Sequence, residues 1–345
     1  MLAYSVKCQN GKSVLLFPFN YLGQRLAAVS SHVFTEATTD GSGTGRHQND
    51  KNNKMREAII GAIINGCVPS AYYHTERWRA LKTAVDGFLH ECSAGYSRVE
   101  CIHTAGRGHN YDFSVKFFAD GDTATTTATT AASVCNVEFK FNAAKVSDTP
   151  QFVSPMKPSQ YLSASYEEYF YDTYLMIIAA AGASAAIPNR ADWLKQIHNN
   201  APVCVKELQD KYYAGCANSS QFTNAADDIA FYELCKKVST ESIRAFISEH
   251  DLDIVKLSQY LRESQDGKTY MLFQPAAASA SASGPSPGPV ITLQRVDPAD
   301  YNIVSCVKNP AKSRYECETQ SGKKINVLLR WKNGNGIAFP AFQIS

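Results

Sequence analysis

Two strand-like segments carry polar residues at alternate positions, and the types and spacing of these residues suit metal-dependent chemistry. Side chains in a strand point to opposite faces in turn, so in the segment from Tyr111 to Phe118 the residues Asp112, Ser114 and Lys116 share a face. The same alternation places Asn136, Glu138 and Lys140 on one face of the segment 134–141. If the two strands are neighbours, we expect Asp112, Glu138 and Lys140 to gather on one face of a sheet.

Such a group suits a divalent cation. Two carboxylates a few ångströms apart repel each other, and both stay ionised only with a cation between them. Oxygen ligands of this kind suit Mg²⁺, which keeps several waters and is completed by a substrate phosphate. Lys140 on the same face can polarise a metal-bound water or stabilise charge on a scissile phosphate. An amphipathic hairpin with a solvent-facing polar side has the same alternation, but the large aromatic residues between the polar positions favour a sheet covered on both faces.

Periodicity predicts the elements that must position these residues. A helix is expected over 52–65, and Thr75 is expected to cap a second one. Strands are expected over 98–103, 111–118 and 134–141, followed by helices and a strand over 268–273. The expected helices lie at 165–180, 190–199, 203–213, 225–250 with a break, and 251–262. This order predicts an α/β fold with a central mixed sheet.

Composition shifts predict the domain boundaries. Residues 1–50 are expected to form an N-terminal segment that is partly flexible, and 51–274 an α/β domain with a helical insertion. The Pro-, Ser- and Ala-rich residues 275–289 cannot build a core and are expected to be a linker. Residues 290–345, with turn signals between apolar runs, are expected to form a small all-β module.

The element order and the polar residues resemble the α-β-β-β-α-β core of the restriction-endonuclease-like, PD-(D/E)XK nuclease superfamily. That superfamily carries its first acidic residue on one strand and E-x-K on the next, as do Asp112 in NYDFSVKF and Glu138-Phe139-Lys140 in NVEFKFNA. Tyr111 stands where the motif often has proline, and a Thr/Ala-rich loop lengthens the separation of the two acids. The resemblance covers roughly residues 50–275 in element order, although only three residues match outright.

This resemblance implies roles for individual residues. Asp112, Glu138 and the carbonyl of Phe139 would bind Mg²⁺, and Lys140 would activate the attacking water. Glu57, near the start of the first helix, would support the metal or its water, or else complement the helix dipole as a first-turn acid. Gln160 would begin the helix after the E-x-K strand and face the site, or else be a solvent-exposed residue of that helix start.

Basic residues mark candidate DNA contacts. Arg107 and His109 lie in a turn just before Asp112, and Lys145 and Lys157 follow the E-x-K strand. Residues 290–345 carry eight basic and four acidic residues, a net charge of +4. With aromatic residues interleaved, this tail suits a module that grips phosphates or bases, although it equally suits a solubilising surface. Its candidates are Lys323, Lys324, Arg330 and Lys332, and its aromatic residues include Tyr315, Trp331 and Phe339.

Composition excludes several classes of protein. A chain of 345 residues that is 44% hydrophobic and 19% charged is neither disordered nor fibrous, and its net charge of +2 means that any basic surface is local. It has no apolar run that could span a bilayer, and its ten cysteines include no CxxC pair. Its first residues, MLAYSVKCQNGK, lack a basic head followed by an apolar stretch, so we expect no secretory signal. We therefore expect reduced, mostly buried thiols in an intracellular protein of the cytoplasm or nucleus. A zinc site of His90, Cys92, Cys101 and His103 has the right ligand types, but residues two apart on a helix do not share a face.

These observations together predict a Mg²⁺-dependent DNA endonuclease of restriction type, in which Mn²⁺ is expected to substitute for Mg²⁺. A homodimer is an option, because palindromic sites have two-fold symmetry. Two alternatives stay open: a repair, recombination or mobile-element nuclease on the same fold, and a non-catalytic nucleic-acid-binding protein with a decayed site.

Overall fold

The computed structural model describes residues 4–7, 13–35, 46–104, 111–119, 133–146, 151–152, 157–182, 187–198, 205–275, 288–332 and 334–345. The chain divides into two compact units, of which unit 1 comprises residues 1–149 and 267–296 and unit 2 comprises residues 150–266 and 297–345. The chain therefore passes from one unit to the other three times. These units do not coincide with the domain boundaries expected from the sequence.

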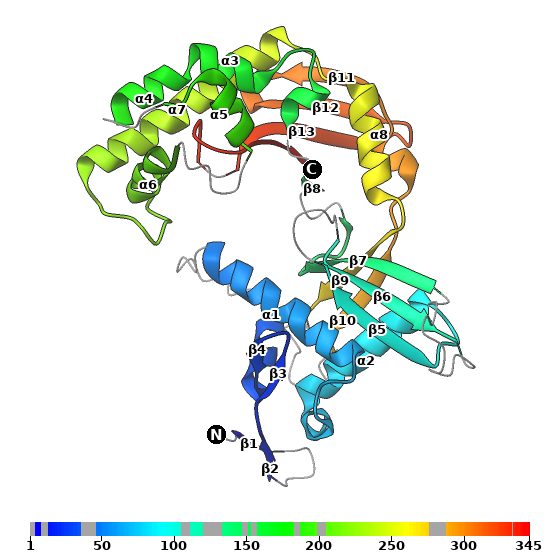
Figure 1. The fold of residues 1–345 in the computed structure, drawn as a ribbon. Helices are drawn as coiled ribbons and strands as arrows, with labels where there is room; N and C mark the ends of the chain where they lie inside the picture. The colour runs from blue at the N-terminus through cyan, green and yellow to red at the C-terminus, as the bar shows by residue number, and fades with distance from the viewer. Residues whose placement is uncertain are drawn as a thin grey trace, which may run out of the picture. The chain divides into compact units, whose positions relative to one another are not determined.

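Unit 1 is built on a five-stranded mixed sheet in the order β10-β9-β7-β6-β5 (Figure 1). Its first three strands along the chain form an antiparallel meander, β9 runs parallel to β7, and β10 is antiparallel to β9. The bounds are β5 Arg98–His103, β6 Phe113–Phe118, β7 Ser133–Phe141, β9 Lys268–Gln274 and β10 Val290–Gln294. The strands expected over 98–103, 111–118, 134–141 and 268–273 are thus confirmed.

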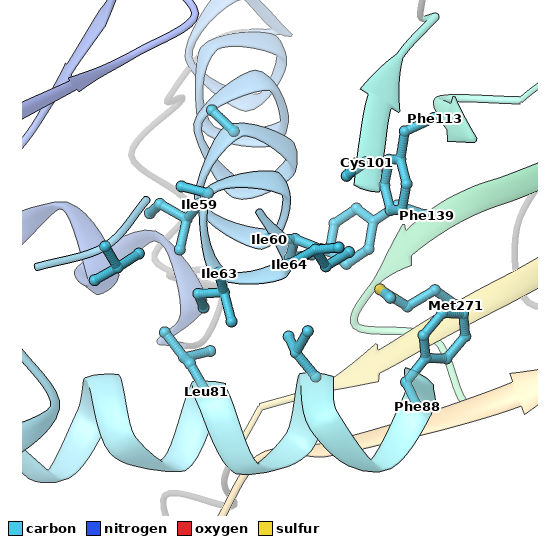
Figure 2. Packing of buried hydrophobic residues seen from close by; sticks show 14 of the residues in the cluster. Ile59, Ile60, Ile63, Ile64, Leu81, Phe88, Cys101, Phe113, Phe139 and Met271 are labelled. Atoms are coloured by element: carbon cyan, nitrogen blue, oxygen red, sulfur yellow. The ribbon is translucent and has the colours of Figure 1, made fainter. Parts of the chain in front are cut away.

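Two helices cover one face of this sheet, α1 (Arg46–Ile64) and α2 (Glu76–Cys92). Isoleucines at helical spacing on α1 pack with Leu81 and Phe88 of α2 and with sheet residues such as Phe113, Phe139 and Met271 (Figure 2). Thr75 is the N-cap residue of α2, as expected, although its side chain makes no capping hydrogen bond. The first helix begins at Arg46 and not at residue 52, so it is longer at its N-terminal end than the sequence predicted.

The opposite face of the sheet carries the polar residues that alternate with the buried apolar residues of β6 and β7. Ser114 of β6 donates a hydrogen bond to Oδ1 of Asn136 of β7 over 2.9 Å, so the polar residues of the two strands do meet on one face. Tyr270 and Leu272 of β9 are buried on this face with Ala143 and Val146. The sheet is therefore partly covered on its second face, which is where the polar residues lie.

The N-terminal part of unit 1 is partly regular. The strands β1 (Tyr4–Lys7) and β2 (Ser13–Leu16) form one antiparallel pair, and β3 (Phe19–Tyr21) and β4 (Gln24–Leu26) form another. A 3-10 helix, η1 (Ala28–Phe34), places Phe34 against Phe273 of β9, with the ring centroids 4.8 Å apart. Short 3-10 turns also occur at η2 (Ser70–His74), η4 (Pro158–Tyr161), η6 (Pro298–Tyr301) and η7 (Pro310–Lys312).

Unit 2 combines a second five-stranded sheet with helices. Its sheet is antiparallel throughout, in the order β11-β12-β13-β14-β8. The strand bounds are β8 Gln151–Phe152, β11 Ile303–Asn309, β12 Arg314–Thr319, β13 Lys324–Trp331 and β14 Pro340–Ile344. The helices are α3 Tyr166–Thr173, α4 Leu175–Gly182, α5 Arg190–Gln196, α6 Lys206–Gly215, α7 Ala226–Glu249 and α8 Ile254–Gln265. The break expected within residues 225–250 is wrong, because α7 is continuous.

The C-terminal strands do not form a separate module. Trp331 of β13 is buried, packs on Phe170 of α3 with ring centroids 4.7 Å apart, and donates a hydrogen bond to the hydroxyl of Tyr166 over 3.0 Å. The helices expected as an insertion in the first domain thus supply the cover that the C-terminal sheet needs. β10 was expected in the tail module but pairs with β9 of unit 1. The segment expected as an interdomain linker, residues 275–289, therefore lies in sequence between two adjacent strands of one sheet.

The structure confirms a mixed α/β protein with a C-terminal antiparallel sheet. Among the residues that it describes, no helix is long and apolar enough to cross a membrane.

Candidate active site

Asp112 lies at the point where β6 begins and where its pairing with β7 stops. Its main-chain amide donates to the carbonyl of Val137 over 2.9 Å, and its Oδ2 accepts a hydrogen bond from the amide of Phe139 over 2.8 Å. The Asp112 carboxylate thus accepts the hydrogen bond from the Phe139 amide that a main-chain carbonyl would accept if β6 extended further. The N–H and C=O of one strand residue point to the same neighbour, so the carbonyl of Phe139 also points to the side of β7 on which Asp112 lies.

Glu138 and Lys140 project from the polar face of β7. The ammonium group of Lys140 donates to Oε1 of Glu138 over 2.6 Å, and the Lys140 and Glu138 side chains are only 20% and 16% exposed. This ion pair is therefore partly shielded from bulk water. Two opposite charges attract each other more strongly in such a place than on an open surface, because the effective dielectric constant is lower.

Glu57 reaches the same group of charges from α1. It lies about three turns inside the helix, and the interpretation as a first-turn acid that complements the helix dipole is therefore wrong. Burial raises the pKa of the Glu57 carboxyl to about 8, with the charges of Asp112 and Glu138 acting in the same direction. Lys54 and Lys140 oppose this shift, which places Glu57 within electrostatic reach of all the candidate residues on the strands.

Lys268, the first residue of β9, is a member of the site that the sequence reading missed. Its side chain is 6% exposed, and its ammonium nitrogen lies 3.9 Å from Oε2 of Glu138. In the parallel register Lys268 pairs with Asn136 and Tyr270 with Glu138, so all four share the polar face. Burial lowers the pKa of Lys268, while Glu138 and Asp112 oppose this. The alternation Lys268, Tyr270, Leu272 was the available signal, but it identified a site residue only once β9 was placed beside β7.

Burial and neighbouring carboxyl groups raise the pKa of two acids of the site, Glu57 and Asp112. Burial and then the charge of Glu138 raise the pKa of Asp112 to about 6, although the Phe139 amide, Lys140 and Lys268 lower it. Asp112 and Glu138 thus lie near Lys140 and Lys268 in a partly buried place, and Glu57 lies within electrostatic reach of them. A divalent cation would reverse the repulsion that raises these pKa values.

The donor set fits Mg²⁺ better than zinc. Asp112, Glu138 and the Phe139 carbonyl are hard oxygen donors, and Mg²⁺ keeps several waters, so two carboxylates suffice. In the described part of the chain no three His, Cys, Asp or Glu side chains gather closely enough to hold a metal ion by themselves. The zinc group considered above is therefore not assembled: Cys92 contacts Cys135 with their sulfurs 3.6 Å apart, while the ring of His103 lies against Tyr21 and Phe113.

The described candidate DNA contacts belong to both units of the chain. Arg107 and His109 lie outside the described residues, and Lys145 is exposed just after β7 in unit 1. Lys157 and Gln160 are exposed residues of unit 2. Gln160 belongs to the 3-10 turn η4 and does not begin an α-helix, because α3 starts only at Tyr166.

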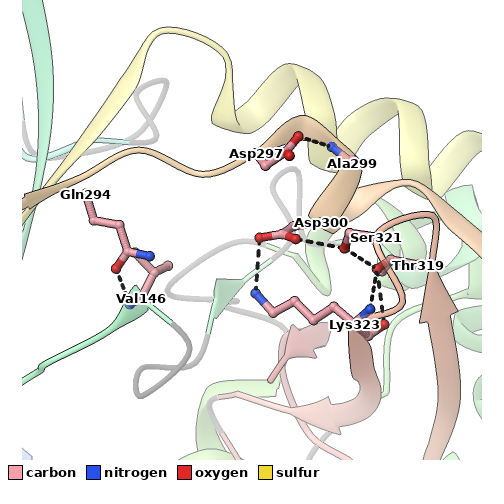
Figure 3. A network of polar contacts seen from close by, with 8 residues as sticks. All are labelled: Val146, Gln294, Asp297, Ala299, Asp300, Thr319, Ser321 and Lys323. Atoms are coloured by element: carbon pink, nitrogen blue, oxygen red, sulfur yellow. Dashed lines mark hydrogen bonds and ion pairs between the residues drawn. The ribbon is translucent and has the colours of Figure 1, made fainter.

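Several basic residues of the tail are engaged within unit 2. Lys323 pairs with Asp300 at 3.7 Å, in a network with Ser321 and Thr319 (Figure 3). Arg330 donates to Gln343 over 2.6 Å, and the ammonium of Lys332 lies 5.6 Å from the ring centre of Phe339. Lys324 is exposed at the start of β13. Tyr315 and Trp331 are buried, so the expectation that they are available to stack on bases is wrong.

The cysteines are free in the part of the chain that is described. Cys101, Cys135, Cys235 and Cys317 are buried, Cys92, Cys216 and Cys306 are half-buried, and Cys67 is exposed.

Comparison of the chain with protein-family models, with curated proteins and with solved structures found no match.

Proposed function

We propose that this protein is a Mg²⁺-dependent DNA endonuclease with a restriction-endonuclease-like, PD-(D/E)XK core. The observation that carries the proposal is the grouping of Asp112, Glu138 and Lys140 beside the start of β6, where the Asp112 carboxylate accepts a hydrogen bond from the amide of Phe139. These are the residues of the E-x-K motif and its preceding acid.

The sheet of unit 1 supports the same proposal. Two helices precede three antiparallel strands, and the fourth strand of this sheet along the chain, β9, is parallel to the third and follows a helical segment. Along the chain this order is similar to the α-β-β-β-α-β order that the resemblance implies, although the helices between β7 and β9 in the sequence belong to unit 2. A parallel return requires a long crossover connection, and residues 142–267 provide one.

Each residue has a defined role in this proposal. Asp112, Glu138 and the carbonyl of Phe139 would hold the cation, and the Phe139 amide fixes the Asp112 carboxylate. When bound, Mg²⁺ acts as a Lewis acid on the scissile phosphate and makes a water molecule more acidic. Lys140, released from Glu138, orients the attacking water and stabilises negative charge on the phosphate. Glu57, on α1, would support the metal or its water, as the resemblance implies. Lys268 keeps Glu138 in place through its second oxygen.

The test is a cleavage assay on supercoiled and linear plasmid with Mg²⁺, Mn²⁺, Ca²⁺ or EDTA, followed by sequencing of the fragment ends. Asp112→Asn and Glu138→Gln keep the shapes of the side chains and should abolish cutting. Lys116→Met is the matched control, because Lys116 shares the polar face of β6 but lies away from the site, opposite Glu100 of β5.

Two results would contradict the proposal. Cutting that persists in Asp112→Asn and Glu138→Gln would come from another site. Retained DNA binding with no metal-dependent cutting by the wild type would instead favour the non-catalytic alternative.

A further inference from the structure

Two cysteines face each other on adjacent strands of unit 2. Cys306 of β11 and Cys317 of β12 are direct partners in the antiparallel register, and their sulfur atoms are 3.0 Å apart. Directly opposed residues of an antiparallel pair have Cα atoms about 4.5–5.5 Å apart. A disulfide accepts Cα separations of about 4.4–6.8 Å, so this pair can be joined without moving the backbone.

The two thiols differ in accessibility. Cys317 is 3% exposed on the buried side of β12, between Tyr315 and Thr319. Cys306 is half-buried on β11, which is the edge strand of the sheet. A reagent in solution can therefore reach the Cys306 thiol before the Cys317 thiol. Cys317 would then react with the modified Cys306 in a second step.

The surroundings keep the pair in register. Lys308 and Tyr315 form the next pair along the same face, and both are tied to the segment between α7 and α8. The hydroxyl of Tyr315 donates to the carbonyl of His250 over 3.1 Å, and Lys308 pairs with Asp251 at 2.8 Å. The hydrogen bond from Cys317 lowers the pKa of Cys306, and the thiolate is the form of cysteine that attacks disulfides.

We propose that Cys306 and Cys317 form a modification site that a small-molecule disulfide such as oxidised glutathione converts into a cross-strand disulfide. The Cys306 thiolate attacks one sulfur of oxidised glutathione, and the S–S bond of the reagent breaks to release one glutathione thiolate. Cys317 loses its proton to solvent, attacks the sulfur of Cys306 in the mixed disulfide, and releases the second glutathione thiolate. Two protein thiols are oxidised and one oxidised glutathione is reduced to two thiols, so no further oxidant is needed.

The bond would link the edge strand β11 covalently to β12. It would close a loop between residues 306 and 317 that persists when the chain unfolds. Closing a short loop lowers the conformational freedom of the unfolded chain, so oxidation should stabilise unit 2. This proposal is independent of the nuclease proposal, because neither cysteine lies in unit 1, which holds the candidate active site.

The experiment treats the full chain with a concentration series of oxidised glutathione, quenches with acid, and alkylates the remaining thiols in denaturant. Non-reducing tryptic mass spectrometry should then find peptide 296–308 linked to peptide 315–323, and the linkage should disappear with dithiothreitol. Cys67, which is exposed, reports whether the reagent reaches thiols. Oxidised wild type should melt about 5 °C higher than reduced wild type.

Two variants separate the steps. Cys317→Ser should trap Cys306 as a mixed disulfide with glutathione, whereas Cys306→Ser should leave Cys317 unmodified. The proposal is overturned if both thiols stay free at a reagent concentration that fully modifies Cys67, or if wild-type Cys306 stops at the mixed disulfide.

Discussion

The main-chain amide of Phe139 donates a hydrogen bond to Oδ2 of Asp112 over 2.8 Å, so a side chain continues the hydrogen bonding of β6 beyond the end of that strand. The bond fixes one oxygen of Asp112 beside β7. It leaves the other oxygen on the side of β7 to which the carbonyl of Phe139 points. The position of the first acid is therefore set by the strand that carries the second one.

Replacing Asp112 with asparagine should separate the effect of the side-chain charge from the effect of its hydrogen bond to the Phe139 amide. The side-chain oxygen that Asp112→Asn retains can still accept the Phe139 amide, so the melting temperature should not fall below that of the wild type. DNA cleavage should fall at least about a hundredfold, because the proposed metal site would lose a charged ligand. In Asp112→Ala the amide of Phe139 also loses its acceptor, which costs about 1–3 kcal/mol. Cleavage assays and thermal melts of both variants check this, and a wild-type rate in Asp112→Asn would contradict the assignment.

Lys140→Met should stop turnover without stopping metal binding. The ammonium group contacts Glu138 and is not itself a ligand, so Mg²⁺ binding by calorimetry should persist. Cleavage should fall about 10²–10³-fold, as for the loss of a group that stabilises transition-state charge. Lys116→Met, a matched loss of one lysine from the same sheet face, should cut DNA like the wild type. Equal loss in both variants would assign the effect to general DNA attraction.

Lys268→Met should tighten Mg²⁺ binding. The buried ammonium group lies 3.9 Å from Glu138 and repels a cation that binds there. Removing one charge at this range should lower the dissociation constant about fivefold. Lys268→Arg keeps the charge and should keep the wild-type constant. Calorimetric titrations of the three proteins give the comparison, and an identical constant in all of them would show that Lys268 does not act on the cation.

The stability of the metal-free protein should fall as pH rises. The pKa of Asp112 is raised to about 6 and that of Glu57 to about 8, so the folded state holds protons that the unfolded chain has already released. Stability contributed by the neutral forms is full below about pH 4, the ordinary range of these groups, and is lost progressively up to about pH 8. In EDTA, Glu57→Gln should therefore melt about 3 °C above wild type at pH 8.5 and close to wild type at pH 5.

Mg²⁺ should counteract this loss. A bound cation favours the ionised carboxyl groups, so it should raise the wild-type melting temperature more at pH 8.5 than at pH 5, and binding near pH 7 should release protons. Melting curves at the two pH values, with and without Mg²⁺, test both statements. A wild-type melting temperature that is independent of Mg²⁺ at pH 8.5 would contradict the metal site.

Local patterns in the sequence determined the elements and the polar face of the hairpin. Alternation at period two is a property of the strand itself, so Glu138 and Lys140 could be placed on one face, and Ser114 and Asn136 on the polar sides of their strands, without any knowledge of the fold. The helical spacing of Ile59, Ile60, Ile63 and Ile64 is likewise a local pattern, and these residues form the buried side of α1.

The tertiary structure alone decided which distant segments meet. Lys268 joins the site because β9 pairs in parallel with β7, and Glu57 joins it because α1 packs against the sheet. The division into units also depends on long-range pairing: β10 belongs with β9, and Trp331 belongs with Tyr166 and Phe170. The Pro-, Ser- and Ala-rich composition of residues 275–289 is typical both of a linker between domains and of a loop between two strands of one sheet. Local composition cannot distinguish these, because the choice depends on which apolar faces bury each other when the chain folds.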